Sequence, residues 1–178
     1  MCSKVEVEKK YSLYKIEFID GSVSVNGKRV GLKTYPMIDG KCGTFFHIIS
    51  KGVENSHREL IILPCKECKF ENPCLDFHEY NPLLHDLREK RAICPERLEK
   101  IDYLVDFFTT PHLKIWEKEH PSKKGVKKRV LFYNEEKNYL VVLEDREIYY
   151  ILWTAYPVGY ESRKEKLLKE YKKATYKK

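Results

Sequence analysis

The 178-residue sequence lacks several features that define broad protein classes. It has no long hydrophobic run, and its longest strongly apolar stretch, residues 149–156, is far too short to span a bilayer. The first ten residues lack the apolar core of a signal peptide, so we expect a cytoplasmic protein with reduced thiols. These absences exclude a membrane protein and a secreted disulfide scaffold. A hydrophobic content of 42% is nevertheless enough for the core of one domain.

The motifs of several common enzyme classes are also absent. The sequence contains no Walker loop, no glycine-rich dinucleotide turn, no His-Glu-x-x-His zinc motif and no Gly-x-Ser-x-Gly nucleophile elbow. Acidic clusters typical of magnesium-dependent nucleases are hard to find. We therefore expect any catalysis to depend on individual side chains, without a catalytic metal ion.

Positive charge is concentrated in two segments of the C-terminal third. The net charge is +7, of which residues 163–178 contribute +6 and residues 118–129 contribute +5, so the other 150 residues sum to −4. A concentrated basic surface attracts polyanions, most often nucleic acid. Five cations within residues 123–129 repel one another, which indicates a compensating partner. For residues 172–178 alone, a solvated lysine-rich tail is the simpler interpretation.

The first 40 residues predict strands and turns. Residues 14–19 alternate apolar and polar side chains, as a strand does. Asn26-Gly27 is a strong hairpin signal, because both positions of such a turn need a positive φ. We therefore expect an N-terminal β-hairpin region over residues 1–42 and an α+β domain over residues 43–178.

Residues 52–94 are predicted to form a loop-rich, cysteine-rich insert. The spacing of Cys65 and Cys68 is that of a metal knuckle, in which two thiolates of one turn reach the same ion. Four thiolates would complete a structural zinc site, with His78 and His85 as substitutes for one ligand. An iron–sulfur cluster, a redox pair and plain thiols are the alternatives. The predicted zinc ligands are Cys65, Cys68, Cys74 and Cys94.

The C-terminal half predicts helices packed on an antiparallel sheet. A helix is expected to start at Cys94-Pro95, with apolar side chains at helical spacing as far as Phe108. Short polar links join three predicted strands, which should form a meander, and a helix follows Gly159. The predicted fold class is α+β. The three strands are expected at residues 129–133, 139–143 and 148–156.

A few side chains suit metal-free RNA cleavage, in which the 2′-OH attacks the adjacent phosphate. That reaction needs a group that moves protons near neutral pH, which His47 can supply. It also needs fixed cations on the developing phosphate charge, which Arg129 can supply, and hydroxyl donors such as Thr154 and Tyr156. Because the attacking group is the 2′-OH, the substrate would be RNA rather than DNA.

Each of these residues also has an ordinary structural interpretation. His47 follows two phenylalanines and is consistent with a core histidine. Arg129 could simply begin a strand, and Tyr156 could simply pack. The spacing of these residues alone does not choose between catalysis and packing.

Six segments of the chain, in this order, resemble the phage-type nucleases of the barnase–EndoU–colicin–RelE-like group. The resemblance covers about residues 43–171, and it implies a RelE/EndoU-like antiparallel sheet that carries a metal-independent ribonuclease site. It points to four catalytic residues and to Lys51 and Lys128 as phosphate contacts. The segments are residues 46–51, 97–101, 128–132, 139–144, 149–158 and 166–171. The catalytic residues that the resemblance implies are His47, Arg129, Thr154 and Tyr156.

The sequence thus predicts a metal-independent endoribonuclease of toxin or mobile-element type, which cleaves RNA by 2′-OH transphosphorylation. Lys127, Lys164 and Lys166 are further predicted RNA contacts. The expected partners are RNA and a protein inhibitor or antitoxin, and no membrane. The first alternative is a non-catalytic, zinc-containing nucleic-acid-binding module. The second is a protein-interaction partner whose basic tail is merely solvated.

Overall fold

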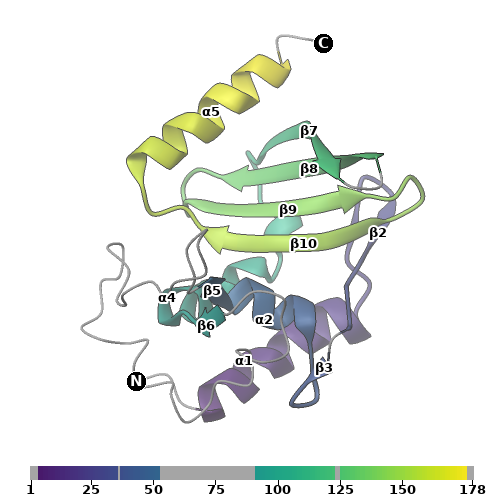
Figure 1. Cartoon of the computed structure of the whole chain (residues 1–178), viewed down its shortest axis with the longest axis vertical. Coiled ribbons are helices and arrows are strands. Elements are labelled where there is room, and N and C mark those ends of the chain that lie inside the picture. The colour runs from purple at the N-terminus through teal and green to yellow at the C-terminus, as the bar shows by residue number, and fades with distance from the viewer. Residues whose placement is uncertain (1–3, 36, 53–90, 123–124, 176–178) are drawn as a thin grey trace.

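A six-stranded, mostly antiparallel sheet organises the fold (Figure 1). The computed structural model describes residues 4–35, 37–52, 91–122 and 125–175. The strand order of the large sheet is β1-β2-β10-β9-β8-β7. Its strands are β1 (Ser24–Val25), β2 (Lys28–Gly31), β7 (Lys114–Ser122), β8 (Gly125–Asn134), β9 (Tyr139–Asp145) and β10 (Tyr150–Pro157). The predicted α+β class is confirmed.

Two small ribbons and several helices complete the described chain. The ribbons pair β3 (Met37–Ile38) with β4 (Lys41–Cys42), and β5 (Ser50–Gly52) with β6 (Arg91–Ile93). The α-helices are α1 (Lys4–Lys15), α2 (Gly43–Ile49), α4 (Pro95–Glu99) and α5 (Glu161–Thr175). The π-helix is η1 (Ile16–Asp20), and the 3-10 helices are η2 (Lys100–Leu104) and η3 (Phe107–Thr109). None of the described helices is both long and apolar enough to cross a membrane.

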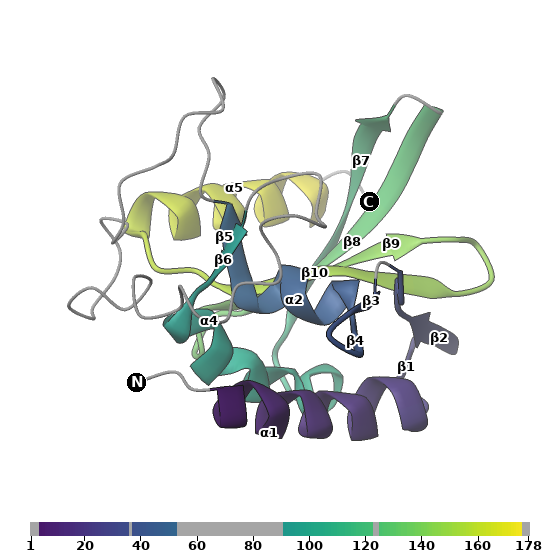
Figure 2. The same ribbon diagram turned by 60° about the horizontal axis from the view of Figure 1, so that its bottom comes forward.

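The predicted meander of three strands is confirmed as β8, β9 and β10. Residues 139–144 of β9 are all buried, as expected for a central strand covered on both faces. The chain before β8 forms a further strand, β7, which was not predicted and whose second half lies in the basic segment at residues 118–129. The pairing of β8 with β9 starts at Arg129, so the earlier part of the β7–β8 hairpin projects beyond the sheet as a two-stranded arm (Figure 2).

Two hydrophobic clusters lie on opposite faces of the sheet because side chains alternate along each strand. On β8, Val130 and Phe132 face the cluster that includes side chains of α1, α2 and α4. Leu131 and Tyr133 face the opposite way, toward the cluster that includes Leu167 of α5. Figure 2 shows α5 on one side of the sheet and α1 on the other. The sheet is therefore the middle layer of three.

The predicted strand at residues 14–19 is wrong, because α1 and η1 occupy this region. Val7, Tyr14 and Phe18 are buried, and Tyr14 and Phe18 stack with their ring centroids 5.2 Å apart. Tyr14 also packs against Phe45 of α2. Residues four apart share a helix face but also share a strand face, so the short alternating stretch fits both periods. Contact with α2 selects the helix.

The helix predicted from Cys94-Pro95 starts there, but after five residues it changes from an α-helix to a 3-10 helix. Pro95 opens α4, which continues as η2, and Leu98 and Ile101 are buried as the spacing predicts. Val105 is exposed because the chain leaves the 3-10 helix at that residue. The predicted C-terminal helix is confirmed as α5, whose Leu167 is fully buried.

The predicted Asn26-Gly27 hairpin is confirmed, since both residues have a positive φ between β1 and β2. Replacing Gly27, whose φ is +76°, with alanine is expected to lower the free energy of unfolding by about 1 kcal/mol. Gly27 has open space around it, so the loss would come from backbone strain alone. Gly52→Ala is the matched control, because no described atom lies within 4 Å of an added Cβ there either, and Gly52 has no positive φ. Urea unfolding followed by circular dichroism measures the free energy of unfolding of both variants. An equal decrease in the two variants would contradict the strain argument.

Candidate active site

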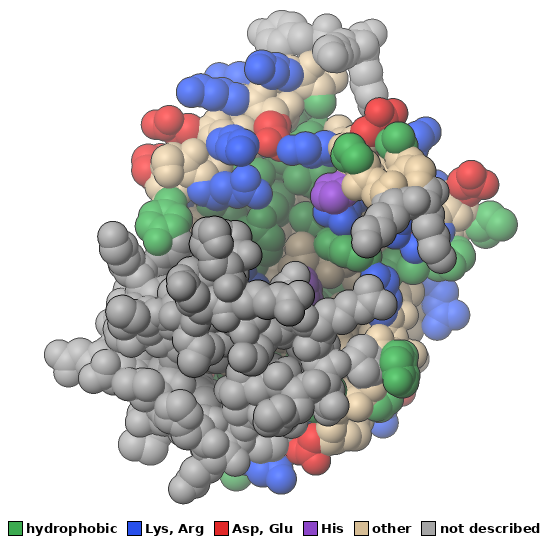
Figure 3. Space-filling view, viewed as in Figure 1, with side chains coloured by type: hydrophobic (Ala, Val, Ile, Leu, Met, Phe, Trp, Pro, Cys, Tyr) green, Lys and Arg blue, Asp and Glu red, His purple; other side chains and the backbone are tan. Residues whose placement is uncertain are grey.

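The candidate site lies on the sheet face that carries α5. Strand alternation places Lys127 and Arg129 of β8 on this face, and Arg129 pairs with Glu144 of β9. Thr154 and Tyr156 of β10 pair with Val142 and Leu140, which belong to the cluster under α5. Three of the four predicted catalytic residues therefore share one face. Lys and Arg side chains line α5 and border the apolar surface of the sheet in Figure 3.

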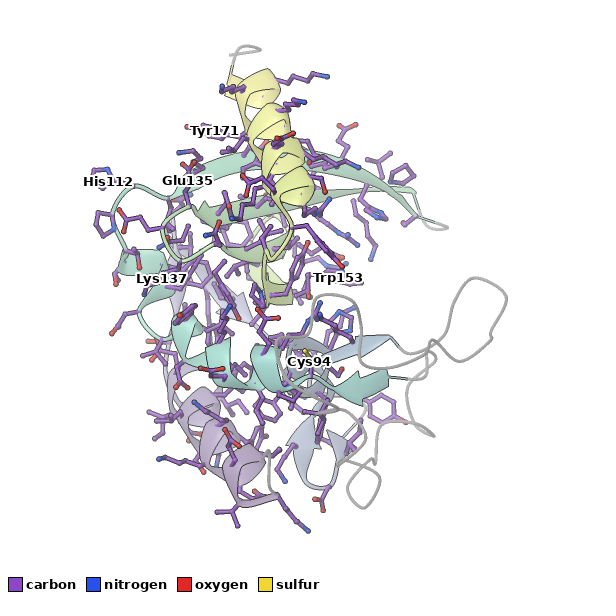
Figure 4. All side chains as sticks on the ribbon, turned by 90° about the vertical axis from the view of Figure 1, so that its left-hand side faces the viewer. Cys94, His112, Glu135, Lys137, Trp153 and Tyr171 are labelled. Carbon is purple, nitrogen blue, oxygen red and sulfur yellow. The ribbon has the colours of Figure 1, made fainter. Side chains whose placement is uncertain are left out.

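Three cationic side chains lie around the indole ring of Trp153 on this face. The Lys33 Nζ lies 3.8 Å from the centroid of the Trp153 ring, and the Arg129 Cζ lies 4.5 Å from it. The Lys127 Nζ is 5.6 Å from the same centroid. We name Lys33, Lys127, Arg129 and Trp153 the Trp153 cluster. Figure 4 shows Trp153 between α5 above and the start of α4, at Cys94, below.

A buried carboxylate neutralises only part of this charge. Glu144 is 1% exposed, and its carboxylate forms ion pairs with Lys127, at 3.2 Å, and with Arg146. Within the described part of the chain, neither Lys33 nor Arg129 forms an ion pair with a carboxylate. The Trp153 ring attracts these two cations through its quadrupole but adds no negative charge of its own. The arrangement therefore favours an anionic ligand.

Burial disfavours the charged forms of Arg129 and Lys33, so an anion bound beside them would be stabilising. Partial burial lowers the pKa of Arg129, against the attraction of Glu144. The pKa of Lys33 is also lowered, mainly by burial and further by the charges of Lys127, Arg146 and Arg129, against the attraction of Glu144. The Nε atom of Arg129 is buried and has no hydrogen-bond partner among the described residues. A phosphate group offers the charge and the acceptor oxygens that both side chains lack.

Helix α2 links Lys33 to His47. The Thr44 hydroxyl donates a hydrogen bond to the Lys33 carbonyl at 2.8 Å, and the Lys33 N–H donates to the Thr44 Oγ1 at 3.1 Å. Positions three apart lie on the same side of an α-helix, so His47 follows Thr44 along the side of α2 that meets Lys33. His47 is half-buried, whereas Phe46 and Ile48 are buried. His47 therefore lies at the edge of the core, on a helix whose buried side chains belong to the cluster on the sheet face opposite α5.

Tyr156 is the centre of a second group of cations. The Arg163 Nη2 of α5 donates a hydrogen bond to the Tyr156 hydroxyl at 3.1 Å. The Arg97 Cζ lies 5.2 Å from the centroid of the Tyr156 ring, while its Nη1 donates to the Ser50 carbonyl at 2.8 Å. We name Tyr156, Arg97 and Arg163 the Tyr156 cluster.

The remaining predicted RNA contacts lie in different places. Lys128 pairs with Glu119 in the β7–β8 hairpin, and strand alternation directs it to the sheet face opposite Arg129. Lys51 lies in β5, and Lys164 of α5 pairs with Glu161 at 3.2 Å. Lys166 is on the exposed side of α5. The structure thus brings Lys127 into the site and separates Lys128 from it.

The predicted zinc ligands fall mostly outside the described residues. Cys65, Cys68 and Cys74 lie there, and only Cys94 is described. Cys94 is a buried, free thiol whose pKa is raised by burial. In the described ranges, no group of three His, Cys, Asp or Glu side chains could hold a metal ion. The zinc site stays a prediction.

Sequence reasoning missed four residues that shape this site. Trp153 lies beside the predicted Thr154, and an aromatic residue next to basic strands was an available signal. Glu144 directly follows a continuous apolar run, which was the sign of a buried charge. Lys33 and Arg163 have no local signal, because pairing between distant elements brings them here. Comparison of the chain with family models, curated proteins and solved structures finds no match.

Proposed function

We propose that the protein is a metal-independent endoribonuclease of toxin or mobile-element type that acts at the Trp153 cluster. The observation that carries the proposal is the pair of cations, Lys33 and Arg129, which lie against one indole ring without a carboxylate partner in the described chain. Both lie within 4.5 Å of one ring centroid, so two positive charges are held close to the same indole. Thr154 and Tyr156 supply hydroxyl groups on the same face.

In this proposal the chain's own residues perform 2′-OH transphosphorylation. Arg129 and Lys33 bind the non-bridging oxygens of the phosphate and stabilise the charge that grows on them in the transition state. The 2′-oxygen forms a bond to phosphorus as the bond from phosphorus to the 5′-oxygen breaks. His47 takes part in transferring the proton from the 2′-OH and in protonating the 5′-oxygen. Thr154 and Tyr156 orient the phosphate through their hydroxyl groups.

The expected result is RNA cleavage that survives excess EDTA and leaves 2′,3′-cyclic phosphate ends. The sharpest substrate is a DNA oligonucleotide pool with one ribonucleotide at a fixed position, because only that position carries the attacking 2′-OH. Cleavage should occur after the ribonucleotide and disappear when it is 2′-O-methylated. Circular dichroism in EDTA must show a folded protein, since EDTA would also remove a structural zinc ion.

The opposite result would favour the non-catalytic module. A folded protein that binds RNA but does not cleave a varied RNA pool, with or without EDTA, contradicts the nuclease proposal. The structural zinc at the four cysteines, a protein inhibitor as partner and a cytoplasmic location stay part of the proposal. Zinc content is measured separately on the purified chain.

A further inference from the structure

The two faces of the β7–β8 arm differ in charge. The arm is the part of the hairpin that extends outward from the pair of Lys118 with Arg129. Side chains paired across two antiparallel strands lie on the same face, and the face alternates along each strand. Lys118 and Arg129 therefore share one face with the next pair but one, His120 with Lys127. We name this the basic face of the arm, because the histidine also becomes a cation when it is protonated.

The other face of the arm is neutral. Glu119 pairs with Lys128, so their charges balance, and Pro121 pairs with Val126. These four side chains are exposed, as His120 is on the basic face. Both faces thus reach solvent, and solubility alone does not account for the cations on one of them.

The basic face continues into the Trp153 cluster, because Lys127 and Arg129 belong to both. Trp116, two residues before Lys118, packs in the cluster under α5, with its ring centroid 5.9 Å from that of Tyr171. The basic face therefore lies on the same side of the sheet as α5. Figure 2 shows the arm bending toward this side, away from α1. The arm and the candidate site form one surface.

Carboxylates balance only part of the charge on this surface. Lys118 pairs with Glu170 of α5 at 3.0 Å. Lys127 shares Glu144 with Arg146. Two carboxylates thus contact three cations in these pairs, and the surface stays positive.

His120 keeps one ring nitrogen for a ligand. Its Nδ1 donates a hydrogen bond to the Pro121 carbonyl at 2.9 Å, since a carbonyl oxygen can only accept. Among the residues that the structure describes, His120 has no carboxylate partner. The protonated ring can therefore donate from Nε2 to a phosphate oxygen.

We infer that the basic face of the arm binds the sugar–phosphate backbone of single-stranded RNA beside the phosphate at the Trp153 cluster. The inference rests on the proposed function, because it takes that cluster as the place of the reacting phosphate. The arm is two strands wide, and paired strands lie only about 5 Å apart, so its cations follow one backbone rather than the two of a duplex. Contacts to phosphates add affinity without reading the base sequence.

Two exposed positions on the arm give a matched pair of variants. His120→Glu places a carboxylate on the basic face, and Val126→Glu places one on the neutral face, where Val126 is 65% exposed. The two variants have the same net charge when the wild-type histidine is neutral. The probe is a labelled oligothymidylate of about ten nucleotides, a length typical of single-strand binding sites. It lacks the 2′-OH, so binding is measured without cleavage.

His120→Glu is expected to weaken binding of this probe about tenfold, because repulsion replaces a phosphate contact. Val126→Glu should change the affinity less than about twofold, as a screened charge on the far face of the arm would. Fluorescence anisotropy measures both affinities, and circular dichroism checks that each variant is folded.

A gain in affinity provides a test that a folding defect cannot imitate. His120→Lys should tighten binding and steepen the salt dependence by about 0.7 in the slope of log K against log salt, the value for one added contact to a single strand. Val126→Lys should leave this slope unchanged. The inference is wrong if wild type does not bind the probe, or if each substitution has the same effect at both positions. Because the probe cannot be cleaved, failure of RNA cleavage and failure of the arm give separate results.

Discussion

The Arg129→Ala variant is expected to cleave RNA about 10²–10³-fold more slowly than wild type, the usual effect of removing one preorganised donor from a developing anion. The guanidinium lies 4.5 Å from the Trp153 centroid, so its position is set before substrate binds. The loss should appear mainly in kcat, because the interaction strengthens as charge grows on the phosphate. Single-turnover cleavage of the one-ribonucleotide substrate measures it.

Arg129→Lys is the matched variant, because it keeps the charge but loses the planar fork. We expect it to recover part of the rate and to remain well below wild type. Unfolding curves for both variants separate a catalytic loss from a folding defect. A rate in folded Arg129→Ala within about threefold of wild type would exclude the assigned role, since a preorganised donor gives a much larger effect.

The His47→Ala variant is expected to lose about 10²–10⁴-fold in cleavage rate while its affinity for RNA stays nearly unchanged. This is the range for removal of a general acid or base. His47 lies on α2 one turn beyond Thr44, which hydrogen-bonds to the Lys33 backbone, and the proposal gives its ring a role in proton transfer rather than in binding. Added imidazole should restore part of the activity, because it can move the same proton.

His112→Ala is the control for His47→Ala, because His112 is exposed and lies away from Trp153 (Figure 4). Its cleavage rate should equal that of wild type. If His47→Ala instead loses stability and RNA affinity together, and imidazole restores nothing, then His47 is a structural residue of α2. The nuclease proposal would then need another proton carrier.

The sequence predicts best those elements whose residue pattern fits only one kind of secondary structure. The run at residues 139–143 fits only a strand buried on both faces, and β9 is that strand. Asn26-Gly27 demands two positive φ angles, which few structures other than a hairpin need. Residues 14–19 fit two periods, and packing against Phe45 decides between them. The contact that decides between helix and strand therefore comes from a residue outside residues 14–19.

The same distinction applies to the candidate site. Arg129, Thr154 and Tyr156 share a sheet face because strand pairing fixes their alternation, which a sequence pattern can anticipate. Lys33 reaches Trp153 only because β2 pairs in parallel with β10, and no pattern near Lys33 indicates this. Arg163 depends likewise on the packing of α5 over the sheet. Local reasoning predicts the strands of the site but not the cations that come from neighbouring elements.

The parallel pairing of β2 with β10 also sets the order in which the site can assemble. Val30 pairs with Tyr150, and 120 positions of the chain separate them. Contacts this distant in sequence form late in folding, because a long loop must close first. During synthesis on the ribosome, Lys33 emerges early and has no indole to bind until β10 follows. Under the proposed function, the phosphate-binding cations and their indole come together only after β10 has left the ribosome.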